Sequence, residues 1–454
     1  MDAVLDIAVA RAGEYLEQST SRPIGATVAV DELRRRLAKP LPEYGTAAED
    51  VIAELARDTD GGLVGSTSGR FFGWVIGGTL PVALAADWLT SAWDQNAASN
   101  LSSPAEAVIE EVCGGWLKDL LGVPSSASFA FVTGCQMAHT TALAAARHQL
   151  LRDRGWDVER SGLAGAPPLR VLAAENAHES FLRSLRLLGF GTQAIVRVPT
   201  DAAGRLDLAA LAGALNADND RPTIVWLQAG ELNTGVFDSF APACTIAHKA
   251  GAWVHVDGAF GLWVATSERY RHLLEGVEHA DSWATDAHKW LNVPYDSGLA
   301  FVAHPEAHRA AMRKTAGYFP DERPGERDSD AFVPESSRRA RGFAVWAALR
   351  TLGRPGVAEL VDRCCALARR FALALDEMPG VQVLNDVVLN QVLVRFGDSD
   401  EVTHRVIAAA QDEGTCWFGA TVWQGMAAAR ISVSNWSTTE ADIDRSVAAI
   451  HGLL

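Results

Sequence analysis

Through the middle of the chain, short apolar runs alternate with segments long enough to form helices, and this alternation leaves few possible folds. The runs are rich in β-branched and other apolar residues, which is typical of buried strands. They occupy residues 127–134, 169–175, 192–199, 222–230, 252–261 and 297–303. Strands that alternate with helices predict an α/β fold with a largely parallel sheet covered on both faces. In such sheets, ligands bind at the carboxyl ends of the strands.

The segments on either side of this region have different residue patterns. Apolar residues at helical spacing before about residue 60 predict two or three helices, separated by a proline-rich turn at 36–46. Residues 321–341 are highly charged and contain prolines, so a mobile surface loop is expected there. Two helical segments and two strand-like runs follow. We therefore predict an N-terminal helical segment, a large domain and a small α+β domain, with bounds at 1–75, 76–345 and 346–454.

Composition narrows the class of protein. The chain has 454 residues, of which 48% are hydrophobic, so it can bury a large core. Its net charge of -16, without a basic run, argues against nucleic acid or an anionic membrane as a partner. The first residues do not resemble a signal peptide, and charged residues interrupt every apolar stretch that approaches the length of a membrane helix. The six cysteines lack CxxC spacing, so no metal site and no disulfide framework is predicted. A soluble, cytoplasmic protein is expected.

Two charged residues stand out because each adjoins a predicted strand. Lys289 lies in the segment DSWATDAHKWLNVPYDS, ahead of a strand. Burial at a sheet edge would lower the pKa of its amine and favour the nucleophilic form, whereas an ordinary loop lysine would be exposed. Asp257 ends the strand VHVDG, where a buried carboxylate needs a partner. A pyridinium nitrogen is one such partner, and a helix cap or structural hydrogen bond is the alternative.

Two further features follow strand ends. Gly134, in VTGCQMAH, lies between a predicted strand and a helix, where free N–H groups bind phosphate. The same pattern occurs in many ordinary strand-to-helix turns. His178, in ENAHESF, lies at the head of a helix. It is either a capping or core histidine, or an imidazole that stacks over a cofactor ring.

Taken together, these motifs resemble the pyridoxal 5'-phosphate (PLP) dependent group II amino-acid decarboxylases, the family of aromatic-L-amino-acid and glutamate decarboxylases. The resemblance runs from about Phe71 to Asp442. It includes RFFGWVIGG, HESF, LNTGVFD, HVDGAFG, DAHKWLNVPYDSG, AGYFP and ARISVSNWSTTEADI. It implies the PLP-dependent transferase-like fold of the aspartate aminotransferase type (fold type I), with residues 76–345 as the PLP-binding domain.

The resemblance implies a role for each matching residue. Lys289 is expected to hold the cofactor as a Schiff base, and Asp257 to pair with its pyridinium nitrogen. His178 is expected to stack on the cofactor ring near the scissile carboxylate. Further cofactor contacts are expected from Gly134, Cys135, Gln136, Ala259, Asp286 and His288. Relatives often have Asn at the position of Asp286, and a carboxylate beside a phosphate is repulsive unless it is protonated or turned away.

Other matches concern the reaction and the substrate. Tyr318 matches a mobile-loop tyrosine that returns a proton to the substrate carbon in decarboxylases of the family. Relatives that form aldehydes typically have Phe there, so Tyr318 favours an amine product. Arg430 matches an arginine near the active site, whose guanidinium suits a carboxylate or a structural ion pair. Phe71 and Phe72 resemble the segment that lines the substrate pocket, although such aromatics also occur in plain cores.

The function implied is decarboxylation of an L-amino acid, of the aromatic class, to the amine and CO2 in a homodimer with active sites at the subunit interface. The alternative is a PLP enzyme of altered outcome, which forms an aldehyde by oxidative deamination or makes a carbon–carbon bond. A PLP-binding scaffold without catalysis is a third reading, which the presence of Lys289, His178 and Tyr318 disfavours. No metal, nucleic acid or membrane enters any of these readings.

Overall fold

The computed structural model describes residues 3–313 and 327–454, which form two compact units. One unit combines the chain up to Gly78 with Leu367–Leu384 and Val392–Leu454. The other consists of Thr79–Ala366 and Asn385–Gln391. We call them the first and the second unit. The second unit contains the large sheet and carries the residues of the predicted cofactor site.

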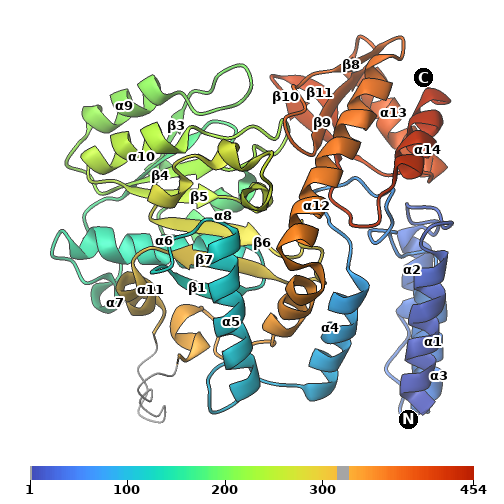
Figure 1. Ribbon diagram of the computed structural model, residues 1–454. Coiled ribbons are helices and arrows are strands. Elements are labelled where there is room, and N and C mark those ends of the chain that lie inside the picture. The colour runs from blue at the N-terminus through green and yellow to red at the C-terminus, as the bar shows by residue number, and fades with distance from the viewer. Residues whose placement is uncertain (1–2, 314–326) are drawn as a thin grey trace. The chain divides into compact units, whose positions relative to one another are not determined.

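A seven-stranded sheet forms the centre of the second unit (Figure 1), in the order β1-β7-β6-β5-β4-β2-β3. Neighbours from β6 through β3 run parallel, and β7 is antiparallel to both β6 and β1. The predicted, largely parallel sheet is therefore confirmed. The strands are β1 Ser128–Val132, β2 Arg170–Ala174, β3 Ile195–Val198, β4 Thr223–Gln228, β5 Trp253–Asp257, β6 Ser282–Asp286 and β7 Gly298–Val302.

Both faces of this sheet are covered, because every residue of all its strands except the edge strand β3 is buried. On one face, α6 and α8 pack on the strands through a cluster that includes Phe181, Leu185 and Trp226. Pro81, Pro104 and Pro305 begin α4, α5 and α11, where a missing N–H costs nothing. The helices are α4 Pro81–Trp93, α5 Pro104–Leu120, α6 Cys135–Arg152, α7 Val158–Ser161, α8 Glu179–Leu187, α9 Leu208–Ala217, α10 Phe240–Lys249 and α11 Pro305–Met312. Short 3-10 helices are η1 Thr192–Ala194, η2 Gly261–Thr266, η3 Arg271–Leu274, η4 Val277–His279 and η5 Ser329–Phe332.

The charged segment 321–341 is only partly described, and its described part is not a surface loop. Arg338 is buried, forms an ion pair with the buried Glu110, and donates to the main-chain oxygens of Ala97 (2.6 Å) and Phe131 (2.8 Å). The expectation of a mobile loop is therefore wrong for residues 327–341. Charge suggested exposure, but the guanidinium finds enough acceptors inside the protein to be buried.

Glu106 lies in the same buried region and is a source of pH dependence. Burial, with the charge of Glu110 nearby, raises the pKa of Glu106 from 4.5 to about 8. Its Oε1 accepts the N–H of Gly342 at 2.7 Å, while Oε2 has no hydrogen-bond partner. The folded protein therefore binds a proton here that the unfolded chain releases above its ordinary pKa. The bound proton contributes its full stabilisation to the fold below the ordinary pKa of the carboxyl group. This stabilisation is lost as the pH rises through the folded-state pKa of about 8.

Glu106→Gln is expected to remove this loss, because the amide is neutral at every pH. Between pH 5 and pH 8 the wild-type protein should lose a few kcal/mol of unfolding free energy relative to the variant. Urea unfolding at both pH values measures the difference. Glu306→Gln, at an exposed position at the start of α11, is the matched control. If the unfolding free energies of wild type and Glu106→Gln changed equally with pH, the raised pKa of Glu106 would be contradicted.

The first unit has helices at its N-terminal end and a small α+β region from the C-terminal part of the chain. Its four-stranded sheet has the order β10-β11-β9-β8. The boundary between the units falls within α12, which is interrupted at Gly353, where φ is 57°. The elements are α1 Ala3–Gln18, α2 Val30–Leu37, α3 Ala48–Thr59, α12 Gly342–Asp376, β8 Val381–Val383, β9 Gln391–Phe396, α13 Asp400–Glu413, β10 Gly419–Trp423, β11 Met426–Ser432 and α14 Glu440–His451. Among the described helices of both units, none has the length and apolar character needed to span a membrane.

Candidate active site

The carboxyl ends of β5 and β6 bring the predicted site residues to one edge of the sheet. Asp257 is the last residue of β5, and Asp286 is the last residue of β6. Because these neighbouring strands are parallel, both carboxylates lie at the same edge. Lys289 follows β6 in the turn that leads to β7. The helix α6 begins at Cys135, close to both strand ends.

Asp286 joins the lysine to the start of α6. Its Oδ2 lies 3.2 Å from Nζ of Lys289, and its Oδ1 accepts the N–H of Cys135 at 2.6 Å. Nε2 of His288 is 3.5 Å from the same Oδ1. A carboxylate at a helix N-terminus is favoured by the unpaired N–H groups and the helix dipole. Asp286 is therefore held by the amine and the helix start.

This arrangement depends on a close approach of Gly298 to the backbone of Gly134. A Cβ atom at Gly298, the first residue of β7, would lie 2.4 Å from Cα of Gly134. Real Cβ atoms essentially never approach another atom that closely, so the backbone of β7 reaches the turn before α6 only because residue 298 has no side chain. A Cβ atom at Gly134 would instead lie 3.2 Å from Cε1 of His288. Since Gly298 pairs with Asp286 across the sheet, the contact also places the Asp286 carboxylate beside the Cys135 N–H.

The amine of Lys289 does not have the depressed pKa that was expected from burial. Its side chain is 21% exposed. Burial does lower the pKa of Lys289, but Asp286, with smaller effects from Cys135 and Asp257, outweighs it, and the pKa is raised above its ordinary value. The expectation was wrong because it considered only desolvation and overlooked the carboxylate three residues earlier in the chain.

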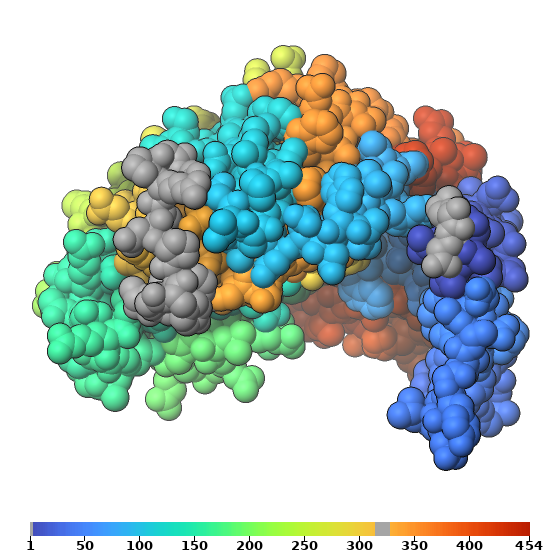
Figure 2. Space-filling view, turned by 90° about the horizontal axis from the view of Figure 1, so that it is seen from below, coloured from blue at the N-terminus to red at the C-terminus, as the bar shows by residue number. Residues whose placement is uncertain are grey.

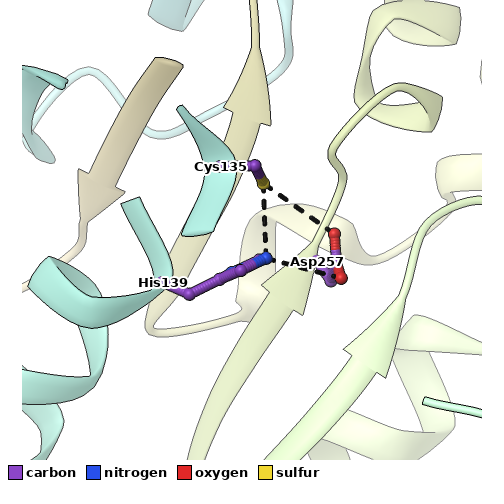
Figure 3. A group of neighbouring side chains, drawn as sticks. All are labelled: Cys135, His139 and Asp257. Atoms are coloured by element: carbon purple, nitrogen blue, oxygen red, sulfur yellow. Dashed lines mark hydrogen bonds and ion pairs between the residues drawn. The ribbon is translucent and has the colours of Figure 1, made fainter. Parts of the chain in front are cut away.

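Asp257 is buried and nevertheless ionised. Oδ1 accepts the N–H of Ala259 at 3.1 Å, and Oδ2 lies 3.5 Å from Nε2 of His139. Burial would raise the pKa of Asp257, but the contact with His139, followed by the weaker electrostatic effects of His178 and Lys289, holds it well below its ordinary value. Figure 3 shows His139 and Cys135 projecting from the first turns of α6 toward the carboxylate. Asp257 is thus a fixed negative charge at the strand end.

The other predicted residues of the second unit lie around this edge. His178 caps α8, where its Nδ1 accepts the N–H of Ser180 at 3.2 Å. The capping alternative is thus present in the structure, and stacking on a cofactor stays a prediction. His288 is buried, and its Nδ1 accepts the N–H of Ser297 at 3.1 Å. The carbonyl of Gln136 accepts from the hydroxyl of Ser184 at 3.1 Å.

The predicted substrate residues belong to other parts of the chain. Phe71 stacks on Trp417 with a centroid distance of 5.0 Å, and Phe72 packs edge-on against Phe371. These two aromatics and Arg430, in β11, are buried in the first unit, so their contact with substrate stays a prediction. Tyr318 lies outside the described residues, and its proposed proton transfer stays a prediction too.

Sequence reasoning missed two histidines that adjoin Asp257. His139 lies four residues after Cys135 on α6, and His255 lies two residues before Asp257 on β5. These spacings place each pair on one side of its element, which was the available signal. Both stand inside motifs quoted above, VTGCQMAH and VHVDG, but no role was assigned to either. In the folded chain, Nδ1 of His139 lies 3.0 Å from Nε2 of His255.

Comparison with known proteins identifies the class of enzyme. The sequence model of the pyridoxal-dependent decarboxylase conserved domain matches residues 31–396. The chain belongs to the pyridoxal-dependent decarboxylase family. The aromatic-L-amino-acid decarboxylase of Bacillus atrophaeus is 27% identical over 442 residues, covering 94% of this chain and 90% of the relative. The L-2,4-diaminobutyrate decarboxylase of Rhizobium meliloti is 28% identical over 424 residues, covering 90% and 83%.

A solved structure confirms the fold. The crystal structure of Oryza sativa TDC with PLP and tryptamine matches this decarboxylase with a TM-score of 0.92 at 24% identity, covering 99% of this chain and 96% of that one. The predicted fold type I architecture is therefore confirmed, and so is the predicted family. This decarboxylase is a PLP-dependent carboxy-lyase that acts on amino acids.

The residues at the edge of the sheet fit PLP. Lys289 offers an amine for the aldehyde, and the ionised Asp257 suits a protonated pyridine nitrogen. The start of α6 offers the positive end of a helix dipole to a phosphate, beside the N–H of Cys135 that Asp286 already accepts. When bound, PLP supplies an electron-accepting ring for the charge that the departing CO2 leaves on the substrate.

Proposed function

We propose that this decarboxylase converts an aromatic L-amino acid to the corresponding amine and CO2. The observation that carries the proposal is the arrangement of Lys289, held at 3.2 Å by Asp286, on the same sheet edge as the ionised Asp257. The aromatic class is supported by the motifs of the sequence and by the name of the relative from Bacillus atrophaeus. The name of the Rhizobium meliloti relative points to a basic substrate instead, so the class has to be measured.

The roles proposed for the chain's own residues follow from their chemistry. Lys289 would hold the cofactor through its aldehyde and would give it up to the amino group of the substrate. Asp257 holds the proton on the pyridine nitrogen, which keeps the ring electron-poor. His178 covers the ring face, and Tyr318 delivers the proton that replaces the lost carboxylate at Cα. Arg430 binds a carboxylate, and Phe71 and Phe72 contact the substrate side chain.

We also propose that the enzyme is a cytoplasmic homodimer with its active sites at the subunit interface. Apolar side chains are exposed on two helices of the second unit, Trp88, Leu89 and Trp93 on α4 and Val108 and Val112 on α5. Figure 2 shows the face over these helices, in blue and cyan. Large apolar side chains in such numbers are typical of a subunit interface. Sedimentation analysis of the holoenzyme measures the state directly.

A substrate panel tests the reaction. The PLP-loaded enzyme is incubated with aromatic, acidic and basic L-amino acids, and CO2, amine, ammonia and hydrogen peroxide are measured. We expect CO2 and amine in equal amounts from an aromatic substrate, without peroxide. Peroxide and ammonia that rise with turnover would show the aldehyde-forming reaction instead. Turnover of only basic or acidic substrates would refute the aromatic assignment, and bound PLP without any turnover would indicate a scaffold.

A further inference from the structure

We propose that His139 is a positioning residue that donates its Nε2 hydrogen to Asp257, and that a buried hydrogen-bond chain through His255 and Ser282 fixes the tautomer in which it does so. The inference rests on the proposed function in one respect, which is the role of Asp257 as partner of the cofactor nitrogen. It assigns to the second unit an element of the cofactor site to which the sequence analysis gave no role.

The chain of contacts runs through three neighbouring elements. Nε1 of Trp253 lies 2.9 Å from Oγ of Ser282, which lies 2.8 Å from Nδ1 of His255. Nε2 of His255 lies 3.0 Å from Nδ1 of His139, and Nε2 of His139 lies 3.5 Å from Oδ2 of Asp257. All five residues are buried. Because β5 alternates its faces, Trp253, His255 and Asp257 all lie on the same side of that strand.

The direction of these hydrogen bonds is set by Trp253, the first residue of the series. An indole N–H can only donate, so Oγ of Ser282 accepts from Trp253. Among the described contacts of Ser282, Nδ1 of His255 is the one acceptor for the hydroxyl hydrogen. Burial lowers the pKa of His255 well below its ordinary value, so this ring is neutral and carries its hydrogen on Nε2. That hydrogen is donated to Nδ1 of His139, which leaves Nε2 of His139 as the donor toward Asp257.

The opposite direction is less favourable. If His139 carried its hydrogen on Nδ1, its bare Nε2 would face the ionised Oδ2 of Asp257 at 3.5 Å. Two acceptors would then oppose each other in a buried site, where the repulsion is strong. Sγ of Cys135 lies 3.3 Å from the same Nε2, and burial raises the pKa of this thiol well above its ordinary value. A neutral thiol adds no charge that would offset the repulsion.

The same atoms raise a rival interpretation. Ligand atoms of Cys135, His139 and Asp257 lie within 4.8 Å of one another, a spacing that could hold a metal ion (Figure 3). A metal would need the bare Nε2 of His139, whereas the proposed tautomer places a hydrogen there. The two interpretations therefore exclude each other, and the position of one hydrogen separates them.

The consequence concerns the charge of Asp257. Burial favours the protonated carboxyl group, and a protonated carboxyl group would not hold a proton on the cofactor nitrogen. A donor fixed at Oδ2 stabilises the ionised form without adding a competing base. We therefore expect His139 to set the affinity for PLP without touching the substrate.

Substitutions at His139 test this role through cofactor binding. His139→Leu should weaken PLP binding to the apoenzyme by about tenfold to a hundredfold, the scale of a lost hydrogen bond to a charged group. His139→Gln places an amide N–H near the position of Nε2 and should restore most of the affinity. His308→Leu is the matched control, because His308 is also buried and bonded to a serine hydroxyl, Oγ of Ser128 at 2.8 Å. Spectral titration of each apoenzyme with PLP gives the dissociation constants.

Nitrogen NMR of the ¹⁵N-histidine-labelled wild-type holoenzyme measures the tautomer in the unaltered protein. We expect a neutral His139 ring with its hydrogen on Nε2, identified by the loss of its signals in His139→Gln, and a mixture of tautomers in Ser282→Ala. A hydrogen on Nδ1 or on both nitrogens, or a stoichiometric metal bound to His139, would overturn the proposal. So would His139→Leu binding PLP as tightly as wild type. Failure of the wild-type protein to bind PLP would instead refute the proposed function itself.

Discussion

Replacing Lys289 with alanine should abolish turnover and remove the visible absorbance of the protein-bound cofactor. The lysine is the amine that Asp286 holds at 3.2 Å on the sheet edge, and no other described lysine adjoins Asp257 or Asp286. Losing both the covalent attachment and a proton-transfer group should lower the decarboxylation rate by roughly 10³-fold or more. Borohydride reduction of the wild-type holoenzyme, followed by peptide mapping, should locate the cofactor on the peptide that contains Lys289.

Lys249→Ala provides the control for this experiment. Lys249 is an exposed residue near the end of α10, so its replacement should leave both absorbance and rate unchanged. If Lys289→Ala retained the wild-type absorbance and rate, or if reduction labelled another lysine, the assignment of the site would be wrong.

Asp257→Asn should have the second largest effect. The amide keeps the shape of the side chain and an acceptor for the N–H of Ala259, but it cannot hold a proton on the cofactor nitrogen by charge. Breaking a buried ion pair costs about 3–5 kcal/mol, which corresponds to a rate loss between about a hundredfold and several thousandfold. The measurement is the decarboxylation rate at saturating PLP, together with the absorption spectrum of the bound cofactor.

Asp281→Asn is the matched control for a general effect of losing a buried carboxylate. Asp281 accepts from His248 at 3.0 Å and from His304 at 2.9 Å, just before the first residue of β6 and so away from its carboxyl end. This variant is expected to lose stability, but at saturating PLP its rate should stay close to wild type. Equal losses of rate in both variants would mean that Asp257 acts only through the fold.

The sequence allowed the sheet and its functional edge to be predicted because the signals were local. Apolar runs indicated six of the seven strands of the large sheet, and Asp257 and Lys289 stand directly beside strands. β6 was missed because its sequence, SWATD, contains polar residues and no continuous apolar run. Those polar side chains are buried because Ser282 bonds to His255 and Trp253, and Asp286 bonds to Cys135 and Lys289.

The electrostatics of the site could not be predicted in the same way, because they depend on residues that are distant in the chain. His139 and Asp257 belong to different elements, and only the packing of α6 on the sheet brings them together. The pKa of Lys289 was predicted in the wrong direction for another reason: Asp286 is only three residues away in the chain, but the sequence pattern did not show that its carboxylate contacts the amine. Arg338 was misplaced because its acceptors come from three other parts of the second unit.

The contact between Gly134 and Gly298 restricts how this enzyme can diversify. A methyl group at Gly298 would collide with the backbone of Gly134, and one at Gly134 would press on the ring of His288 at 3.2 Å, so the backbone of this turn cannot change without a coordinated rearrangement of β7. The side chains of Cys135 and Gln136, which follow in the helix, carry no such backbone constraint. New substrate preferences in descendants of this chain should therefore arise through side-chain replacement on an unchanged framework.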